Sequence, residues 1–180
     1  IWLWGPGPKP RLEALEKKFG VKGALISAVN LIKGIGVYAG MEVIDVPGAT
    51  GYYDTNYEGK ADYAMNALQR NDFVFIHVEA PDEAGHEGSA ERKVRVLEEF
   101  DRRLVGRVLE RARGCTIAVL PDHPTPISKR VHVPDPVPFV IYREGEQGDQ
   151  LTFSESAGER GSLGFIEGSE FMKLLLKIGR

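Results

Sequence analysis

The chain has 180 residues and a net charge of −3, and it is 42% hydrophobic and 27% charged. This composition is typical of a globular α/β protein and excludes a disordered or fibrous chain. The small negative charge excludes a broadly basic surface for nucleic acid, and apolar runs such as Phe73–Val78 are too short to cross a membrane. The single cysteine, Cys115, and the absence of a signal-peptide pattern predict a cytoplasmic protein.

Apolar runs alternate with helical patterns along the chain, which predicts a mainly parallel sheet covered by helices on both faces. The expected strands are Ile1–Trp4, Ala24–Ser27, Glu42–Val46, Phe73–Glu79, Thr116–Leu120 and Pro138–Tyr142. The expected helices are Leu12–Lys18, Ala28–Tyr38, Tyr57–Gln69, Ser89–Arg111 and Gly168–Lys177. The polar segment 144–164 is expected to be a loop or lid.

Two expected elements carry more detailed predictions. The run Phe73–Ile76 is almost continuously apolar, as a strand buried on both faces should be. In the helix expected after Ser89, apolar residues recur at spacings of three and four, namely Val94, Leu97, Phe100, Leu104, Val108 and Leu109.

The chain starts without methionine, on the apolar run Ile1–Trp4, as if a strand were already under way. We therefore expect one domain over residues 1–180 that lacks an N-terminal segment of the same protein. The oligomeric state stays open, and an oligomer is possible.

Acidic and histidine side chains follow two of the expected strands. Asp82 and His86 come after the first, and one helical turn or a tight turn would point both at one ion. Asp122 and His123 follow the second, and His132 comes nine residues later. If the two strands are parallel neighbours, these loops open onto one crevice at the carboxyl edge of the sheet. Mixed carboxylate and imidazole donors favour Zn²⁺ or Mn²⁺ over Ca²⁺.

Each of these features has an ordinary structural alternative. Asp82 follows a proline and could cap a helix. His77 lies inside an expected strand, which favours a hydrogen-bonded core histidine over a ligand, and Glu79 could be a supporting residue or a cap. Lys33 lies among apolar and glycine residues, where an exposed lysine and a phosphate-binding lysine are equally compatible with the pattern. The nearby glycines match neither the phosphate-loop nor the dinucleotide-binding pattern.

Several segments of the sequence resemble the archaeal-type cofactor-independent phosphoglycerate mutases, a family of the alkaline phosphatase superfamily. They are Ile26–Gly34, Val46–Tyr52, Asp54–Lys60, Glu79–His86, Leu120–Pro126, and His132 followed by Asp135–Phe139. The resemblance covers nearly the whole chain. It implies a partial alkaline-phosphatase-like core, phosphoglycerate as substrate and a phosphoserine intermediate.

The resemblance also implies a division of roles between two divalent ions, with Mn²⁺, Zn²⁺, Mg²⁺ and Co²⁺ all open. Asp82, His86 and His132 would hold one ion, Asp122 and His123 would contribute to the other, and Lys33 would contact the phosphoryl group. An aspartate and the nucleophilic serine are expected in the missing N-terminal segment, so we expect this chain to be inactive alone. A phosphatase or phosphodiesterase of the same superfamily, or a non-catalytic metal-binding module, is the alternative.

Overall fold

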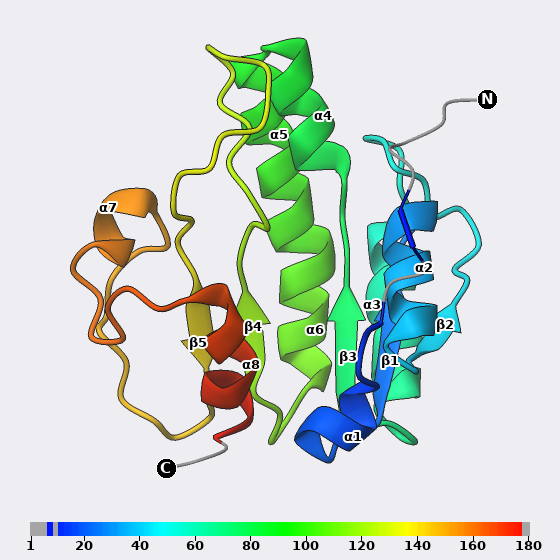
Figure 1. Ribbon diagram of the computed structural model, residues 1–180. Helices are drawn as coiled ribbons and strands as arrows, with labels where there is room; N and C mark the ends of the chain where they lie inside the picture. The colour runs from blue at the N-terminus through cyan, green and yellow to red at the C-terminus, as the bar shows by residue number, and fades with distance from the viewer. Residues whose placement is uncertain (1–6, 9–10, 178–180) are drawn as a thin grey trace. The chain divides into compact units, whose positions relative to one another are not determined.

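The computed structural model describes residues 7–8 and 11–177, shown in colour in Figure 1. Contacts divide the chain into two compact units, Ile1–Ala80 and Pro81–Arg180. The strand expected at Ile1–Trp4 lies outside the described residues, and one domain over residues 1–180 stays a prediction. In the part of the chain that is described, no helix combines the length and the apolar character needed to cross a membrane.

The first unit contains a three-stranded sheet in the order β2-β1-β3. Its strands are β1 (Gly23–Ile26), β2 (Glu42–Ile44) and β3 (Phe73–Ile76). Both pairings are parallel, with Leu25 of β1 opposite Val43 on one side and Phe75 on the other. The predicted parallel sheet is therefore confirmed in this unit.

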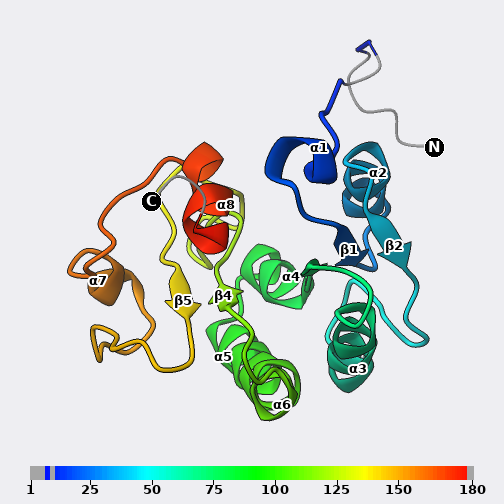
Figure 2. The same ribbon diagram turned by 90° about the horizontal axis from the view of Figure 1, so that it is seen from below.

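Helices cover both faces of this sheet. The unit contains α1 (Leu15–Phe19), α2 (Asn30–Tyr38) and α3 (Tyr57–Ala67), and Figure 2 shows α2 and α3 on opposite faces. Gly36 lets α2 approach the strands closely, because a Cβ there would lie 2.9 Å from Leu25 Cδ1 and 3.3 Å from Val43 Cγ2. Asn56 begins α3 by accepting a hydrogen bond from the backbone N–H of Gly59 at 2.8 Å.

The strand buried on both faces is β1, and the prediction of complete burial for Phe73–Ile76 is wrong. Ala24 and Ile26 of β1 are fully buried, whereas Phe75 of β3 is 39% exposed. The reason is sheet order, since β1 has a partner on each side and β3 pairs with β1 alone among the described strands.

The second unit contains most of the helices. Its elements are α4 (Ala80–Glu87, which starts at the last residue of the first unit), α5 (Ala90–Phe100), a π-helical turn η1 (Asp101–Val105), α6 (Gly106–Arg111), β4 (Ile117–Val119), β5 (Val140–Tyr142), α7 (Glu155–Gly158) and α8 (Gly168–Leu176). The helix predicted from Ser89 to Arg111 is confirmed as the continuous run α5–η1–α6.

The residues buried along the α5–η1–α6 run differ in part from the apolar residues that the spacing predicted. Its buried residues include Leu104 and Val108, as predicted, and also Val96. Val94, Leu97 and Leu109 are about half exposed, so spacing alone identified only part of the packed side.

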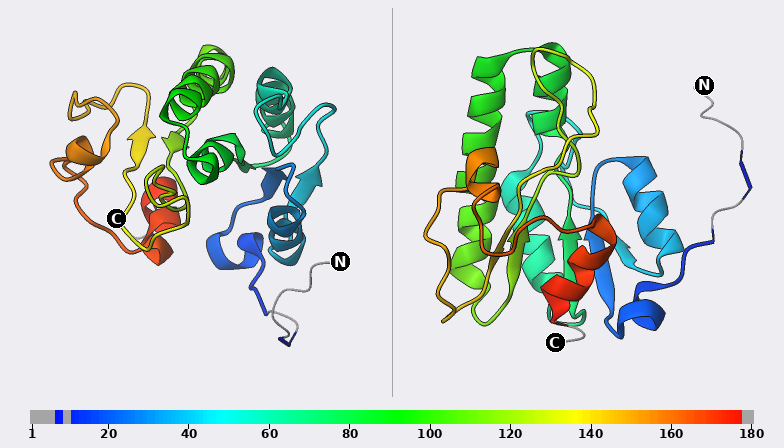
Figure 3. Two further views of the ribbon diagram at one scale, coloured as in Figure 1. Left: turned by 90° about the horizontal axis from the view of Figure 1, so that it is seen from above. Right: turned by 60° about the vertical axis from the view of Figure 1, so that its left-hand side comes forward.

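The strands of the second unit form an antiparallel pair, with Ala118 of β4 opposite Ile141 of β5. Among the described strands, β3 therefore pairs with β1 and β4 pairs with β5, so the condition that the strands near 73–79 and 116–120 are parallel neighbours is not met in these ladders. A segment rich in proline, residues 133–138, returns the chain so that β5 runs back along β4. Figure 3 shows α8 and the α5–α6 run on opposite faces of this pair. The expected loop 144–164 also contains the short helix α7.

Candidate metal centre

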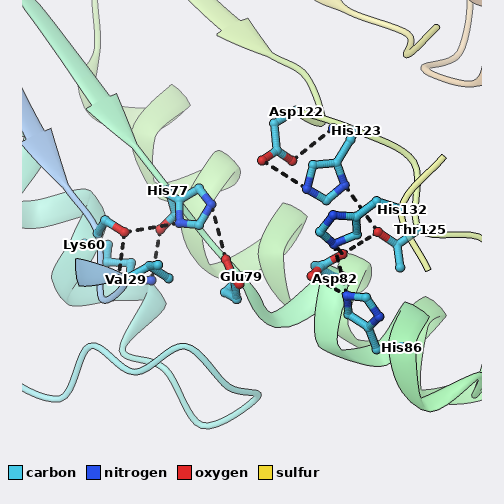
Figure 4. A network of polar contacts seen from close by, with 11 residues as sticks. Val29, Lys60, His77, Glu79, Asp82, His86, Asp122, His123, Thr125 and His132 are labelled. Atoms are coloured by element: carbon cyan, nitrogen blue, oxygen red, sulfur yellow. Dashed lines mark hydrogen bonds and ion pairs between the residues drawn. The ribbon is translucent and has the colours of Figure 1, made fainter. Parts of the chain in front are cut away.

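The residues proposed as metal ligands all lie in the second unit, and Figure 4 shows their side chains gathered together. They are Asp82, His86, Asp122, His123 and His132. Asp82 and His86 are one turn apart on α4. The other three come from the segment between β4 and β5. We call these five residues the donor cluster.

Two histidines of the donor cluster, His86 and His132, converge on Asp82. His86 Nε2 lies 3.1 Å from Asp82 Oδ2, and His132 Nε2 lies 3.4 Å from Asp82 Oδ1. The two Nε2 atoms are 3.0 Å apart. Four ligand atoms at about 2.1 Å from a tetrahedral Zn²⁺ would be roughly 3.4 Å from one another. The observed spacing therefore fits donors that share one cation.

His123 lies beside both Asp122 and His132. His123 Nε2 is 3.4 Å from Asp122 Oδ2, and the rings of His123 and His132 have centroids 3.8 Å apart. Ligand atoms of Asp82, His123 and His132 also lie within 4.8 Å of one another. The geometry thus places His132 within reach of both groups of donors, and the division into three ligands and two stays a prediction.

The orientation of His86 suits a metal ligand. Its Nδ1 lies 2.9 Å from the carbonyl oxygen of Arg130, so an N–H there leaves the lone pair of Nε2 facing the other donors. Arg130 has a positive φ of 56°, and its guanidinium occupies the place that a Cβ at Gly88 would take. The hydrogen bond to this carbonyl raises the pKa of His86; burial opposes the shift, and the charge of Asp82 adds to it.

Asp82 is the most enclosed acid in the cluster, with a side chain 19% exposed. Burial by itself would raise the pKa of Asp82, but a hydrogen bond from Thr125 and the charges of His86 and His132 outweigh it. The net effect lowers the pKa of Asp82 below its usual value, so this carboxylate is ionised at neutral pH and suited to a cation.

Lys33 belongs to the other unit. It lies on α2, and its Nζ forms an ion pair with Asp45 Oδ1 at 2.6 Å. Its contact with a phosphoryl group stays a prediction.

The sequence interpretation of His77 as a hydrogen-bonded core residue is confirmed. Its Nδ1 lies 3.2 Å from Ser27 Oγ, its Nε2 lies 3.4 Å from Glu79 Oε2, and its side chain is 12% exposed. Lys60 Nζ donates to the carbonyl oxygen of His77 at 3.1 Å. We call Ser27, Lys60, His77 and Glu79 the His77 network.

Sequence reasoning missed Thr125 and Arg130. Thr125 Oγ1 donates to Asp82 Oδ1 and lies 3.3 Å from His123 Nδ1. Its position two residues after His123 could have drawn attention to it. Arg130 contacts His86 through its backbone carbonyl. Every residue type carries such a carbonyl, so no sequence pattern indicates this contact.

Comparisons with known proteins agree with the predicted resemblance. A phosphoglycerate mutase from Methanosarcina acetivorans, independent of 2,3-bisphosphoglycerate, is 52% identical over 99% of this chain, and a probable mutase of that kind from Geobacter sulfurreducens is 46% identical over 98% of it. The chain spans a little under half the length of each, at 46% and 45%.

Two solved structures share the fold. A protein from Pyrococcus horikoshii superposes with a TM-score of 0.86 and 34% identity, over 93% of this chain and 52% of its own. A cofactor-independent phosphoglycerate mutase from Thermoplasma acidophilum gives a TM-score of 0.72 and 28% identity, over 95% of this chain and 40% of its own. The family model of the metalloenzyme superfamily matches residues 1–178, so this chain belongs to the metalloenzyme superfamily.

Proposed function

We propose that the chain is part of a cofactor-independent phosphoglycerate mutase, which interconverts 3-phosphoglycerate and 2-phosphoglycerate through a phosphoserine intermediate. The observation that carries the proposal is the donor cluster, found in a chain that is about half identical to such mutases. Such a glycolytic activity would place the protein in the cytoplasm.

In this proposal Asp82, His86 and His132 hold one divalent ion, and Asp122 and His123 contribute to a second. The mixture of carboxylates and imidazoles accepts Mn²⁺, Zn²⁺, Mg²⁺ or Co²⁺. Two bound ions would supply charge that activates a hydroxyl and neutralises the phosphoryl oxygens. The chain's own contribution is to keep Asp82 ionised and the Nε2 atom of His86 facing the site.

Lys33 would neutralise charge on the transferred phosphoryl group. For this it must release Asp45, whose side chain is 84% exposed. An ion pair this open to solvent contributes at most about 1 kcal/mol, so a phosphate can displace the carboxylate at low cost.

We propose that the nucleophilic serine and a further metal-binding aspartate come from residues beyond these 180. Two serines at the ends of elements have structural contacts that support this. Ser27 is 2% exposed and accepts a hydrogen bond from the N–H of Val29. Ser89 caps α5 by accepting one from the N–H of Arg92.

The experiment has two parts. Elemental analysis of the purified chain, loaded with Mn²⁺ and freed of excess by gel filtration, is expected to show bound metal. An enolase-coupled assay is expected to show no mutase activity from the chain alone, and activity once the preceding half of the Methanosarcina acetivorans relative is added.

The other outcomes are equally informative. Mutase activity from the chain alone would refute the external nucleophile. Release of phosphate without isomerisation would identify a hydrolase, and bound metal without turnover in the mixture would identify a metal-binding module. A chain that binds no divalent ion would refute the metal centre itself.

A further inference from the structure

Thr125 contacts two members of the donor cluster with a single hydroxyl group. The side chain hydrogen-bonds Asp82 Oδ1, and its Oγ1 lies 3.3 Å from His123 Nδ1. Thr125 is 3% exposed, whereas the side chains of the three histidines of the cluster are between 31% and 52% exposed. Figure 4 shows Thr125 among the side chains of Asp82, His123 and His132.

A hydroxyl has one proton to donate and two lone pairs that accept. Because an ionised carboxylate only accepts, the Thr125 O–H donates to Asp82, and the oxygen is then an acceptor for an N–H on His123 Nδ1. That tautomer leaves the lone pair on His123 Nε2, the nitrogen 3.4 Å from Asp122 Oδ2. One hydroxyl therefore orients an oxygen ligand and selects the tautomer of a nitrogen ligand.

The backbone of Thr125 is held by two helices. A Cβ at Gly85 of α4 would lie 2.5 Å from the carbonyl oxygen of Thr125 and 2.9 Å from its Cβ, so only glycine allows this approach. Lys93 of α5 donates from Nζ to the same carbonyl at 2.8 Å. The neighbouring carbonyl of Pro124 accepts a hydrogen bond from the N–H of Val133 at 3.1 Å, next to His132. The loop after β4 is thus fixed against the helix that carries Asp82.

We propose that Thr125 is a positioning residue that sets Asp82 and His123 for cation binding, and that Gly85 and Lys93 hold it in place. The proposal rests on the proposed metal centre. Outer partners of metal ligands contribute about 10-fold to 100-fold in metal affinity. The hydroxyl, and not the bulk of the side chain, is the group that acts.

The test compares Thr125→Val, which keeps the shape and removes the hydroxyl, with Thr125→Ser, which keeps the hydroxyl. Titration calorimetry of the chain with Mn²⁺ and with Zn²⁺ is expected to show roughly 10-fold to 100-fold weaker binding for Thr125→Val. Thr125→Ser is expected to stay within about threefold of the unaltered chain, because it restores both hydrogen bonds. The visible spectrum of bound Co²⁺ should change in Thr125→Val alone.

A matched control separates positioning from packing. Thr55 in the first unit is 1% exposed, and its hydroxyl accepts a hydrogen bond from the N–H of Thr50. Thr55→Val should lower the melting temperature of the metal-free chain without weakening Mn²⁺ binding. If it weakens Mn²⁺ binding as much as Thr125→Val does, the effect is one of stability and the inference is wrong.

A second variant keeps the proposal testable if Thr125→Val does not fold. Lys93→Met removes the donor to the Thr125 carbonyl and is expected to weaken Mn²⁺ binding about fivefold, as for one hydrogen bond. If Thr125→Val binds Mn²⁺ as tightly as the unaltered chain, the positioning role is overturned and the metal centre still stands. If Thr125→Val does not fold, unchanged Mn²⁺ affinity in Lys93→Met has the same meaning. Failure of the unaltered chain to bind Mn²⁺ and Zn²⁺ would instead refute the metal centre, and the inference with it.

Discussion

The His77 network and the donor cluster use the same kinds of side chain in opposite ways. In the His77 network, each ring nitrogen of His77 faces an oxygen of a different residue, Ser27 or Glu79. In the donor cluster, the Nε2 atoms of His86 and His132 face each other at 3.0 Å, and both face Asp82. Figure 4 shows His77 beside Glu79, and the rings of His86 and His132 beside Asp82.

This difference separates an arrangement that stabilises the fold from the arrangement expected of a cation site. Buried polar groups stabilise a fold when donors meet acceptors, as around His77. Nitrogen and oxygen atoms of like function that converge on one point complement a cation instead. Residue type alone would treat the histidines of both regions alike, whereas the partners of each ring nitrogen distinguish them.

The largest expected effect is that of His132→Ala on Mn²⁺ binding by the donor cluster. This change removes a nitrogen within reach of both Asp82 and His123, so we expect Mn²⁺ affinity to fall by more than the roughly 100-fold that an outer partner can cost. The free energy of unfolding of the metal-free chain should change by less than about 0.5 kcal/mol, since the His132 side chain is 52% exposed. Calorimetric titration and urea unfolding measure the two quantities, and equal Mn²⁺ affinity would remove His132 from the site.

Lys60, a member of the His77 network, should make the free energy of unfolding depend on pH. Burial lowers the pKa of Lys60 to about 8, although the negative charge of Glu79 opposes the shift. In the unfolded chain the Lys60 amine has its ordinary pKa of 10.5. Between these pH values the unfolded state binds more protons, so the free energy of unfolding rises with pH, by at most about 3 kcal/mol.

Lys60→Met should remove this rise. Urea unfolding of both proteins from pH 8 to 10.5 gives the measurement, and the other lysines and tyrosines cancel in the difference. Parallel curves for the two proteins would show that Lys60 keeps an ordinary pKa.

Local pattern was enough to predict much of the fold and the residues of the site. The apolar run of β1 and the capped start of α5 at Ser89 are determined by neighbours in sequence. Asp82 and His86 could be paired because residues four apart share a helix face. That the five donors gather in one unit agrees with the sequence interpretation, while their roles as ligands stay predictions.

What the sequence could not predict depends on contacts between distant residues. The pairing of β4 with β5 is decided by how the chain returns between them. The exposure of Phe75 depends on whether its strand has one neighbour or two. Thr125 and the carbonyl of Arg130 matter through where the fold places them beside Asp82 and His86.

A smaller effect is expected from His77→Ala, which tests the structural role of the His77 network. Removing the ring between Ser27 and Glu79 should lower the free energy of unfolding by about 2 kcal/mol, because hydrogen bonds are lost in a mostly buried place. Mn²⁺ affinity should stay within about threefold, in contrast to His132→Ala. A larger loss of affinity would mean that the two regions act as one network.

The smallest expected effects come from the helix caps, one in each unit. Ser89→Ala should cost about 1 kcal/mol of unfolding free energy, because the N–H of Arg92 loses its acceptor. Asn56→Ala should cost somewhat more, because Asn56 also donates from Nδ2 to the carbonyl of Pro47 at 2.9 Å. One domain over residues 1–180 predicts a single calorimetric transition, in which both substitutions lower the same melting temperature and Mn²⁺ raises it. If Mn²⁺ instead raises only a transition that Ser89→Ala lowers, the two units unfold separately and the donor cluster stabilises its own unit alone.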